Sequence, residues 1–358
     1  MSKRNNAVEF YRFFFSQIIV LFHFARYTTL QTTKPFHSGN LAVELFLLLS
    51  GYFLARSTRM QEGRTLEDIL SGNLKYMKSR FLRLYPHYLL AVLCVGFVQI
   101  FVMNALGLKS WIKNGYMELL MLQSISGADC LSPVFWFPSA LFTASFVVHF
   151  LMLWKPRLCT RFLFPIAAPA IVASLIDANG VIFATQPYHF LFSSGFWRAL
   201  AEIMLGCVCY DIVQSNKKER TGKAGGVLCA LLELGLLLVL CYLFYTPQFR
   251  SKSTLVLLLS MAFLILVFSQ ESCLSRLLNN KASAYLGKIS YAVYLNQIVF
   301  TVIGNRFFPF PDGTPVWLVV AACIAANVLL SMLTTWMVEK VSLRLEKGTG
   351  RLLSLIGW

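Results

Sequence analysis

The stretch YRFFFSQIIVLFHFARYTTLQTTKPFHSGNLAVELFLLLSGYFLA, residues 11–55, decides how this chain is built. Two apolar segments are joined by a short polar loop, and three ionisable residues lie within the apolar segments: Arg12, His23 and Glu44. An ionisable side chain in lipid costs several kcal/mol by most estimates, so each of the three is a candidate functional residue.

Arg12 and His23 share one face of the first predicted helix. Eleven helical residues make about three turns and rise about 16 Å, which puts the two side chains in line. Imidazole titrates near neutral pH, so His23 in a partly dry cavity is suited to act as a general base. Glu44, on the next helix, is the nearest carboxylate along the chain that would orient it. The alternative interpretation is a structural Arg–Glu pair beside a hydrogen-bonded histidine.

The composition indicates a membrane protein. Of 358 residues, 57% are hydrophobic and 13% are charged, about half the charge that is usual in a soluble protein. The apolar residues form long blocks separated by basic clusters, a pattern typical of a polytopic α-helical protein. The net charge of +16 does not indicate a nucleic-acid partner, because the basic residues stand at the ends of apolar blocks.

We expect an all-α protein with about ten transmembrane helices in a single domain over residues 1–358, without a separate soluble domain. The expected spans are 7–30, 39–56, 84–106, 134–154, 161–177, 196–214, 224–245, 253–270, 286–306 and 315–339; residues 111–126 and 181–195 are expected to be interfacial or re-entrant. With the N-terminus inside, the inner segments hold 23 Lys and Arg residues and the outer ones 7. This bias predicts that both termini are cytoplasmic.

A basic cluster precedes the third predicted span, in the sequence YMKSRFLRLYPHYLLAV. Arg80 and Arg83 are three residues apart and share a helix face, with Lys75 and Lys78 close behind. Two guanidinium groups on one face suit phosphate binding, since each offers a planar fork of donors. A generic positive-inside anchor is the other interpretation. The residues Tyr85-Pro86 are expected to open the third helix.

These motifs resemble those of the membrane acyltransferase family 3. The resemblance rests on Arg12 with ten residues before His23, on VELFLLLSGYFLA, and on R-x-x-R ahead of Tyr-Pro. Four later stretches are similar too: FWFPSALFTASFVVHFL, FWRALAEIMLGCVCY, LGKISYAVYLNQIVF and the closing VEK. The family often has His after Tyr-Leu in the ninth helix. This chain has Asn296 there, which can bind a sugar hydroxyl but cannot exchange protons.

The resemblance implies a standalone O-acyltransferase of the bacterial plasma membrane, with polysaccharide modification by O-acetylation as its usual role. Cytoplasmic acyl-CoA, typically acetyl-CoA, would be the donor substrate, and no permanently bound cofactor is implied. The acceptor would be a hydroxyl of an extracytoplasmic glycan or its lipid-linked precursor. Arg80, Arg83 and Lys78 would bind the donor, and Arg12, His23 and Glu44 would serve catalysis. Acceptor-side candidates are Trp136, Arg198, Asn296 and His37.

Two other classes of function fit part of the pattern. A transporter or flippase would also carry intramembrane charges and a basic loop, but matched halves with interrupted helices are not evident. A scaffold for an envelope assembly would not need Arg12 and His23 in lipid. The nine scattered cysteines contain no CxxC, so we expect neither a metal site nor a disulfide framework. The sequence does not indicate the oligomeric state.

Overall fold

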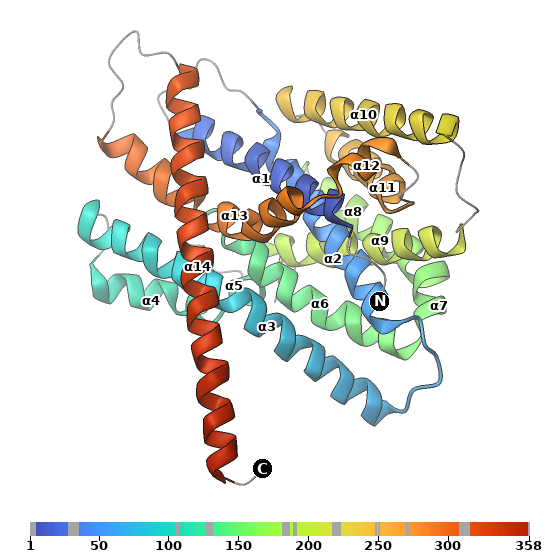
Figure 1. Cartoon of the computed structure of the whole chain (residues 1–358), viewed down its shortest axis with the longest axis horizontal. Coiled ribbons are helices and arrows are strands. Elements are labelled where there is room, and N and C mark those ends of the chain that lie inside the picture. Colours follow the sequence, from blue (N-terminus) through green and yellow to red (C-terminus); the bar gives the residue numbers. More distant parts are fainter. Residues whose placement is uncertain are drawn as a thin grey trace.

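The computed structural model describes residues 5–27, 36–104, 107–126, 132–180, 187–188, 192–216, 223–247, 249, 251–269, 272–307 and 316–356. Over this part the chain is almost wholly helical (Figure 1). The helices are α1 (Asn6–Tyr27), α2 (Val43–Thr58), α3 (Leu66–Phe97), α4 (Leu108–Leu119), α5 (Gln123–Ser126), α6 (Trp136–Trp154), α7 (Pro156–Leu158), α8 (Phe164–Asn179), α9 (Ser194–Ser215), α10 (Lys223–Tyr245), α11 (Lys252–Ser269), α12 (Cys273–Leu278), α13 (Lys281–Phe307) and α14 (Val316–Ile356).

Shorter elements complete the described structure. A 3₁₀ turn, η2 (Gly39–Ala42), precedes α2, and π-helical turns η3 (Val98–Val102) and η4 (Cys159–Leu163) extend α3 and precede α8. Two-residue strands β1 (Pro187–Tyr188) and β2 (Phe192–Ser193) pair antiparallel ahead of α9.

The predicted all-α fold with many membrane-spanning helices is confirmed, and the cytoplasmic placement of both termini stays a prediction. Within the described residues, eight helical stretches are long and apolar enough to cross a bilayer. They lie in α1, η2–α2, α3–η3, α6, α7–α8, α10, α11 and α14. The other two predicted spans are the helices α9 and α13, of 22 and 27 residues, which are long enough but more polar. α10 exposes many large apolar side chains, among them Leu228, Leu231 and Leu238, as expected of a helix that faces lipid.

The predicted start of the third span was wrong. α3 begins at Leu66, where Thr65 and Asp68 form a capping box, and continues through Pro86. Pro86 was interpreted as a helix start, because proline favours the first turn. Within membrane helices proline is tolerated, since neighbouring groups satisfy the freed carbonyl. Arg80 and Arg83 therefore stand in mid-helix, well inside α3 rather than at its entrance.

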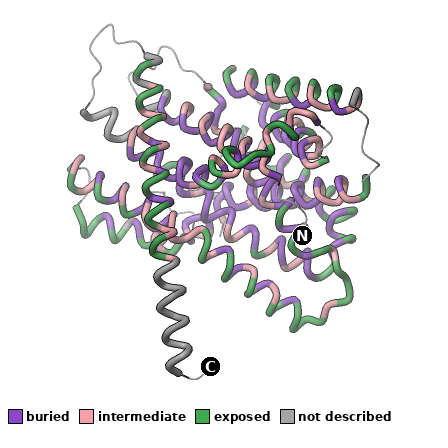
Figure 2. Tube along the Cα trace, in the orientation of Figure 1, coloured by how far each residue is buried: buried purple, intermediate pink, exposed green. Residues whose placement is uncertain are grey.

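The α2–α9 pair forms the centre of the bundle. Its two helices cross where Gly51 faces Gly206: a Cβ added to Gly51 would overlap the carbonyl oxygen of Ile203, and one added to Gly206 would overlap that of Leu48. Small residues at such a crossing let two membrane backbones come close. Figure 2 shows the buried residues concentrated in these central helices.

α1 packs along α13, and α13 in turn contacts α3 and α14. Gly287 of α13 lies against Glu9 of α1 so closely that a Cβ there would overlap the Glu9 side chain. This crossing sets the position of the first turns of α1 beside α13. α13 thereby lies against both α1 and α3, and we call this region the α1–α3–α13 junction.

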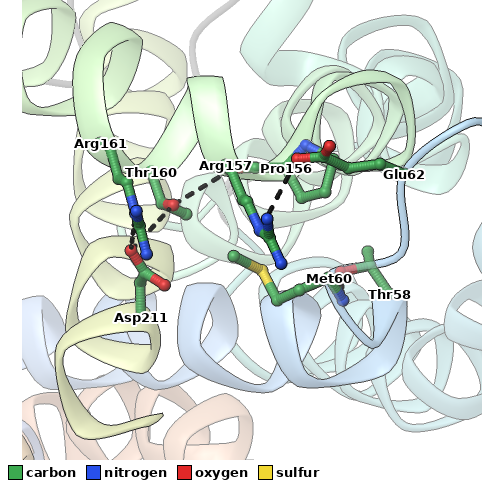
Figure 3. Close-up of polar contacts among 8 residues, drawn as sticks. All are labelled: Thr58, Met60, Glu62, Pro156, Arg157, Thr160, Arg161 and Asp211. Atoms are coloured by element: carbon green, nitrogen blue, oxygen red, sulfur yellow. Dashed lines mark hydrogen bonds and ion pairs between the residues drawn. The ribbon is translucent and has the colours of Figure 1, made fainter. Parts of the chain in front are cut away.

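Polar contacts close the end of the bundle where α2 ends and α9 finishes (Figure 3). Arg161 of η4 pairs with Asp211 of α9 at 3.5 Å, and Thr160 donates to the same carboxylate. Arg157 of α7 and Glu62 of the α2–α3 loop form an exposed ion pair at 3.8 Å. Exposed pairs of this kind contribute little to stability, so we regard these residues as a surface rim of the bundle and not as part of its core.

Candidate functional site

Arginines from two helices lie within electrostatic range of one another at the α1–α3–α13 junction. Arg12 is partly exposed and donates to the buried Glu9 Oε2 at 2.8 Å, one turn earlier on α1. Arg83 on α3 lies within electrostatic range of Arg80, Arg12 and Glu9. The structure therefore brings together Arg12, Arg80 and Arg83, which we call the α1–α3 arginine cluster. Three guanidinium groups share one nearby carboxylate, so positive charge is in excess there.

A chain of side chains from α3 and α6 holds Arg80. Arg80 is buried, and its Nη1 donates to the hydroxyl of Tyr76 at 2.8 Å. The Tyr76 ring stacks on His149 of α6 with centroids 3.9 Å apart. His149 Nδ1 in turn lies 2.9 Å from Asn73 Oδ1. Packing and hydrogen bonding thus fix the direction of the Arg80 side chain.

Several polar atoms at this junction are buried without a hydrogen-bond partner among the described residues. They are Arg80 Nε, His87 Nδ1 and the hydroxyl of Tyr291. Tyr291 comes from α13, lies near the His87 ring and is within electrostatic range of Arg80. Buried polar groups are nearly always satisfied in native proteins. Unmet groups beside excess positive charge are the mark of a site for an anionic ligand.

A cavity of about 590 Å³ opens next to this cluster, at the same end of the bundle as the rim in Figure 3. Its volume is within the usual range of ligand sites. One wall is formed by residues of α3, and the α2–α3 loop and α6 supply the rest; its lining includes Arg64, Asp68, Lys75, Tyr76, Ser79 and His149. Tyr76 and His149 belong both to this lining and to the chain that holds Arg80.

The three residues predicted to bind the donor differ in burial. Arg80 is 6% exposed, whereas Lys78 and Arg83 are exposed on α3. Lys78 is two residues from Arg80 and therefore on another side of the helix. Arg83 continues the stripe of Asp68, Lys75 and Ser79 that lines the cavity, since the spacing of four from Ser79 returns to the same face.

His23 is almost buried, at 9% exposure, near the other end of α1. It stands on the same face of α1 as Arg12, three turns away. Its ring packs edge-on against Phe22, which lies beside Gly39 of η2. His23 therefore lies close to the segment that precedes α2, and the helix face that carries it also carries Arg12 of the arginine cluster.

Glu44 belongs to a second charged cluster. Its Oε1 accepts a 2.6 Å hydrogen bond from Arg198 Nη2, and Arg198 Nε donates to Glu202 at 3.0 Å. The guanidinium also lies 5.3 Å from the ring centroid of Trp136. We call these four residues the Arg198 cluster; it joins α2, α6 and α9. Pairing of Glu44 with His23 stays a prediction, since the described partner of Glu44 is on α9.

The Arg198 cluster is closed and almost dry. Arg198, Glu44 and Glu202 are each at most 1% exposed. One guanidinium faces two carboxyl groups at hydrogen-bond distance, so the three side chains form one compact buried network. The second oxygens of Glu44 and Glu202 are buried without a hydrogen-bond partner among the described residues.

The two other acceptor-side candidates lie apart. Asn296 of α13 uses its amide nitrogen to donate to Ser331 and Thr334 of α14, at 3.3 and 3.0 Å. His37 is exposed ahead of η2. Next to it, Ser38 is buried and accepts from the ammonium group of Lys252 at 3.0 Å, which ties this loop to α11.

Sequence reasoning missed the partners of the charged residues. Tyr76 is four residues before Arg80, and Glu202 is four after Arg198, so both pairs follow the helical spacing at which side chains meet. That spacing was a usable signal. His149 and Tyr291 come from other helices, and nothing in the local sequence connects them to Arg80.

Comparison with known proteins gives one family. The profile of an acyltransferase domain matches residues 5–336, which is nearly the whole chain. Searches among curated proteins and solved structures found no significant match. The match runs from the start of α1 to the middle of α14 and includes every element that builds the two clusters. The chain is a multi-pass membrane protein that belongs to the acyltransferase family 3, as its motifs indicated.

Proposed function

We propose that this acyltransferase moves an acetyl group from acetyl-CoA to a hydroxyl of an extracytoplasmic glycan or its lipid-linked precursor. The observation that carries the proposal is the α1–α3 arginine cluster: three guanidinium groups and buried unmet donors beside an open cavity. A donor with several phosphates supplies the acceptor atoms that such a site lacks. The proposed side of the membrane is the cytoplasm, where the predicted loops carry most Lys and Arg residues.

The proposed donor lies along α1. Its phosphates bind Arg80 and Arg83, with Lys78 adding positive charge at the surface. Its long, thin pantetheine arm then extends past Arg12 toward His23. The rise of about 16 Å between Arg12 and His23 requires an elongated ligand, which a CoA thioester is.

In the proposed reaction His23 is the general base. The acceptor hydroxyl oxygen attacks the thioester carbonyl carbon while the imidazole takes the hydroxyl proton. The carbon–sulfur bond then breaks, and the thiolate leaves and takes the proton back from the imidazolium. The new ester and free CoA are the products. Arg12 serves in binding the donor and in stabilising the oxyanion that forms on the carbonyl oxygen.

The proposed acceptor side lies near Trp136 and His37. Trp136 is half-buried with one side turned to Arg198, and an aromatic ring is suited to pack on a sugar. Arg198 and Glu44 support this side by holding α2, α6 and α9 together. Asn296 contributes through its carbonyl oxygen, because its amide nitrogen is already bound to α14.

The test is a transfer assay on membranes that contain the protein, with acetyl-CoA labelled in the acetyl group. We expect base-labile label in glycan material with wild type, and at least a hundredfold loss in His23→Ala, since general bases contribute about 10²–10⁴-fold. Arg157→Ala, which removes a cation from the nearby rim, is the control and should label normally. Wild-type rates in His23→Ala would contradict the base; absence of acetyl-CoA-dependent label with folded wild type would contradict the reaction.

A further inference from the structure

The cavity beside α3 is lined by two positively charged side chains, Arg64 and Lys75. Arg64, in the α2–α3 loop, donates through Nη2 to the carbonyl oxygen of Thr58 at 2.8 Å, which fixes its guanidinium. Its Nη1 is buried and has no hydrogen-bond partner among the described residues, although the residue lines the cavity. Lys75, on α3, is exposed and also lines the cavity. Two cations thus face one polar space from two elements.

The single carboxylate in the lining does not offset both cations. Asp68 Oδ2 is engaged at the start of α3, where the hydroxyl and amide groups of Thr65 donate to it at 2.7 and 3.3 Å. Glu62, just outside the cavity, pairs with Arg157. Since Arg64 and Arg80 are both within electrostatic range of His149, the cavity and the arginine cluster share one field.

The cavity also continues the path of the proposed donor. Residues 68, 72, 75 and 79 line it along one stripe of α3, and Arg83 is the next residue on that stripe. A ligand whose phosphates reach Arg83 and Arg80 would therefore have its nucleotide end at Lys75 and Arg64. The thioester end would point the opposite way, toward Arg12 and His23.

We propose that this cavity is a subsite for a phosphate monoester on a ribose, and that Arg64 and Lys75 bind the 3′-phosphate of the CoA donor. A monoester carries close to two negative charges near neutral pH, more than a phosphodiester, and suits a guanidinium fork beside an ammonium group. The inference rests on the proposed function and deepens it, because it makes these two residues the determinants that separate CoA from donors without that phosphate.

The test compares CoA with 3′-dephospho-CoA by calorimetric titration of the purified full-length protein in detergent. Charge-assisted hydrogen bonds favour the phosphorylated form, so wild type should bind CoA about tenfold or more tightly than dephospho-CoA. Arg64→Ala with Lys75→Ala should bind both ligands with the weaker affinity. Lys75→Glu, a change at an exposed position that leaves the Arg64–Thr58 bond intact, should weaken CoA alone. Arg157→Ala is the control and should keep the tenfold ratio.

The outcomes separate the inference from the function on which it rests. Equal affinities in wild type, or a tenfold ratio that survives both the double variant and Lys75→Glu, would overturn the subsite. If the subsite is overturned but wild type still binds dephospho-CoA, the proposal that acyl-CoA is the donor is retained. Failure of folded wild type to bind either ligand would overturn both. A lipid headgroup is the other source of a phosphate monoester. Phosphatidic acid added to the detergent should lower the ratio of CoA affinity to dephospho-CoA affinity only if the lipid phosphate enters the same cavity.

Discussion

Two arginine sites in this protein use the same side chain in opposite ways. Arg198 is enclosed by two carboxyl groups and an aromatic ring, and almost no solvent reaches it. Arg12, Arg80 and Arg83 share one carboxylate, and the donors around them are only partly used. The difference lies in the balance of charge: one guanidinium faces two carboxyl groups in the first site, whereas three share one carboxylate in the second. We infer that the first arrangement is structural and that the second leaves positive charge for a ligand.

The largest expected effect is on the closed cluster. Arg198→Leu leaves two buried carboxyl groups without their cation, and breaking a buried pair costs roughly 3–5 kcal/mol. We expect the variant to lose monodisperse, folded protein in size-exclusion chromatography. Arg157→Leu is the matched control: its ion pair is exposed, so its melting temperature should stay close to that of wild type.

The comparison would fail if Arg198→Leu melted like wild type. It is sharpened by a rescue variant, in which Glu44→Gln and Glu202→Gln are added to Arg198→Leu. Without the buried charges, part of the lost stability should return, because amides cost less to bury than unpaired carboxylates.

A smaller loss of stability is expected at the crossing that supports the closed cluster. Gly206→Ala places a methyl group on the carbonyl oxygen of Leu48, and overpacking of this kind typically costs 1–3 kcal/mol. Gly235→Ala on α10 is the matched control, since a Cβ there meets open space. A lower melting temperature in the first and none in the second is the expected result. If the Gly206→Ala and Gly235→Ala variants had equal melting temperatures, α2 and α9 would be able to move apart to accommodate the methyl group without loss of stability.

The smallest effect is expected where Arg80 is held. Tyr76→Phe removes the hydroxyl that accepts from Arg80 and keeps the ring on His149. This hydrogen bond contributes a net of about 0.5–1.5 kcal/mol, so its loss predicts a slightly lower melting temperature and roughly twofold to tenfold weaker acetyl-CoA binding. Tyr85→Phe, on the same helix but bonded to the carbonyl of Leu119, should bind normally. If both variants bind equally well, Tyr76 does not position Arg80.

Much of the fold was predictable, because hydropathy and length determine which segments become membrane helices. The ten predicted spans correspond to described helices. α3 is the exception: charged residues before position 84 place the start of the predicted span there, and Tyr85-Pro86 predicts a helix start, whereas the helix begins at Leu66. Helices outside the apolar layer depend on caps such as Thr65, whose signal is weaker than hydropathy.

The site was predictable only in part. The motifs identified Arg12, Arg80 and Arg83, but which helices meet is decided by packing between distant segments, such as Gly287 against Glu9. Glu44 shows the same limit. It is the first carboxylate that follows His23 in the chain, whereas its bond goes to Arg198, 154 residues away.

Acetyl-CoA binding tests the central claim most directly, and it requires no knowledge of the acceptor. Purified wild type, His23→Ala, Arg157→Ala and the double variant Arg80→Ala with Arg83→Ala would be titrated after a check that each is folded. The account predicts saturable binding to the first three and at least a tenfold loss in the double variant, since two charge-assisted contacts disappear. Binding that is unchanged in the double variant, or absent from folded wild type, would contradict it.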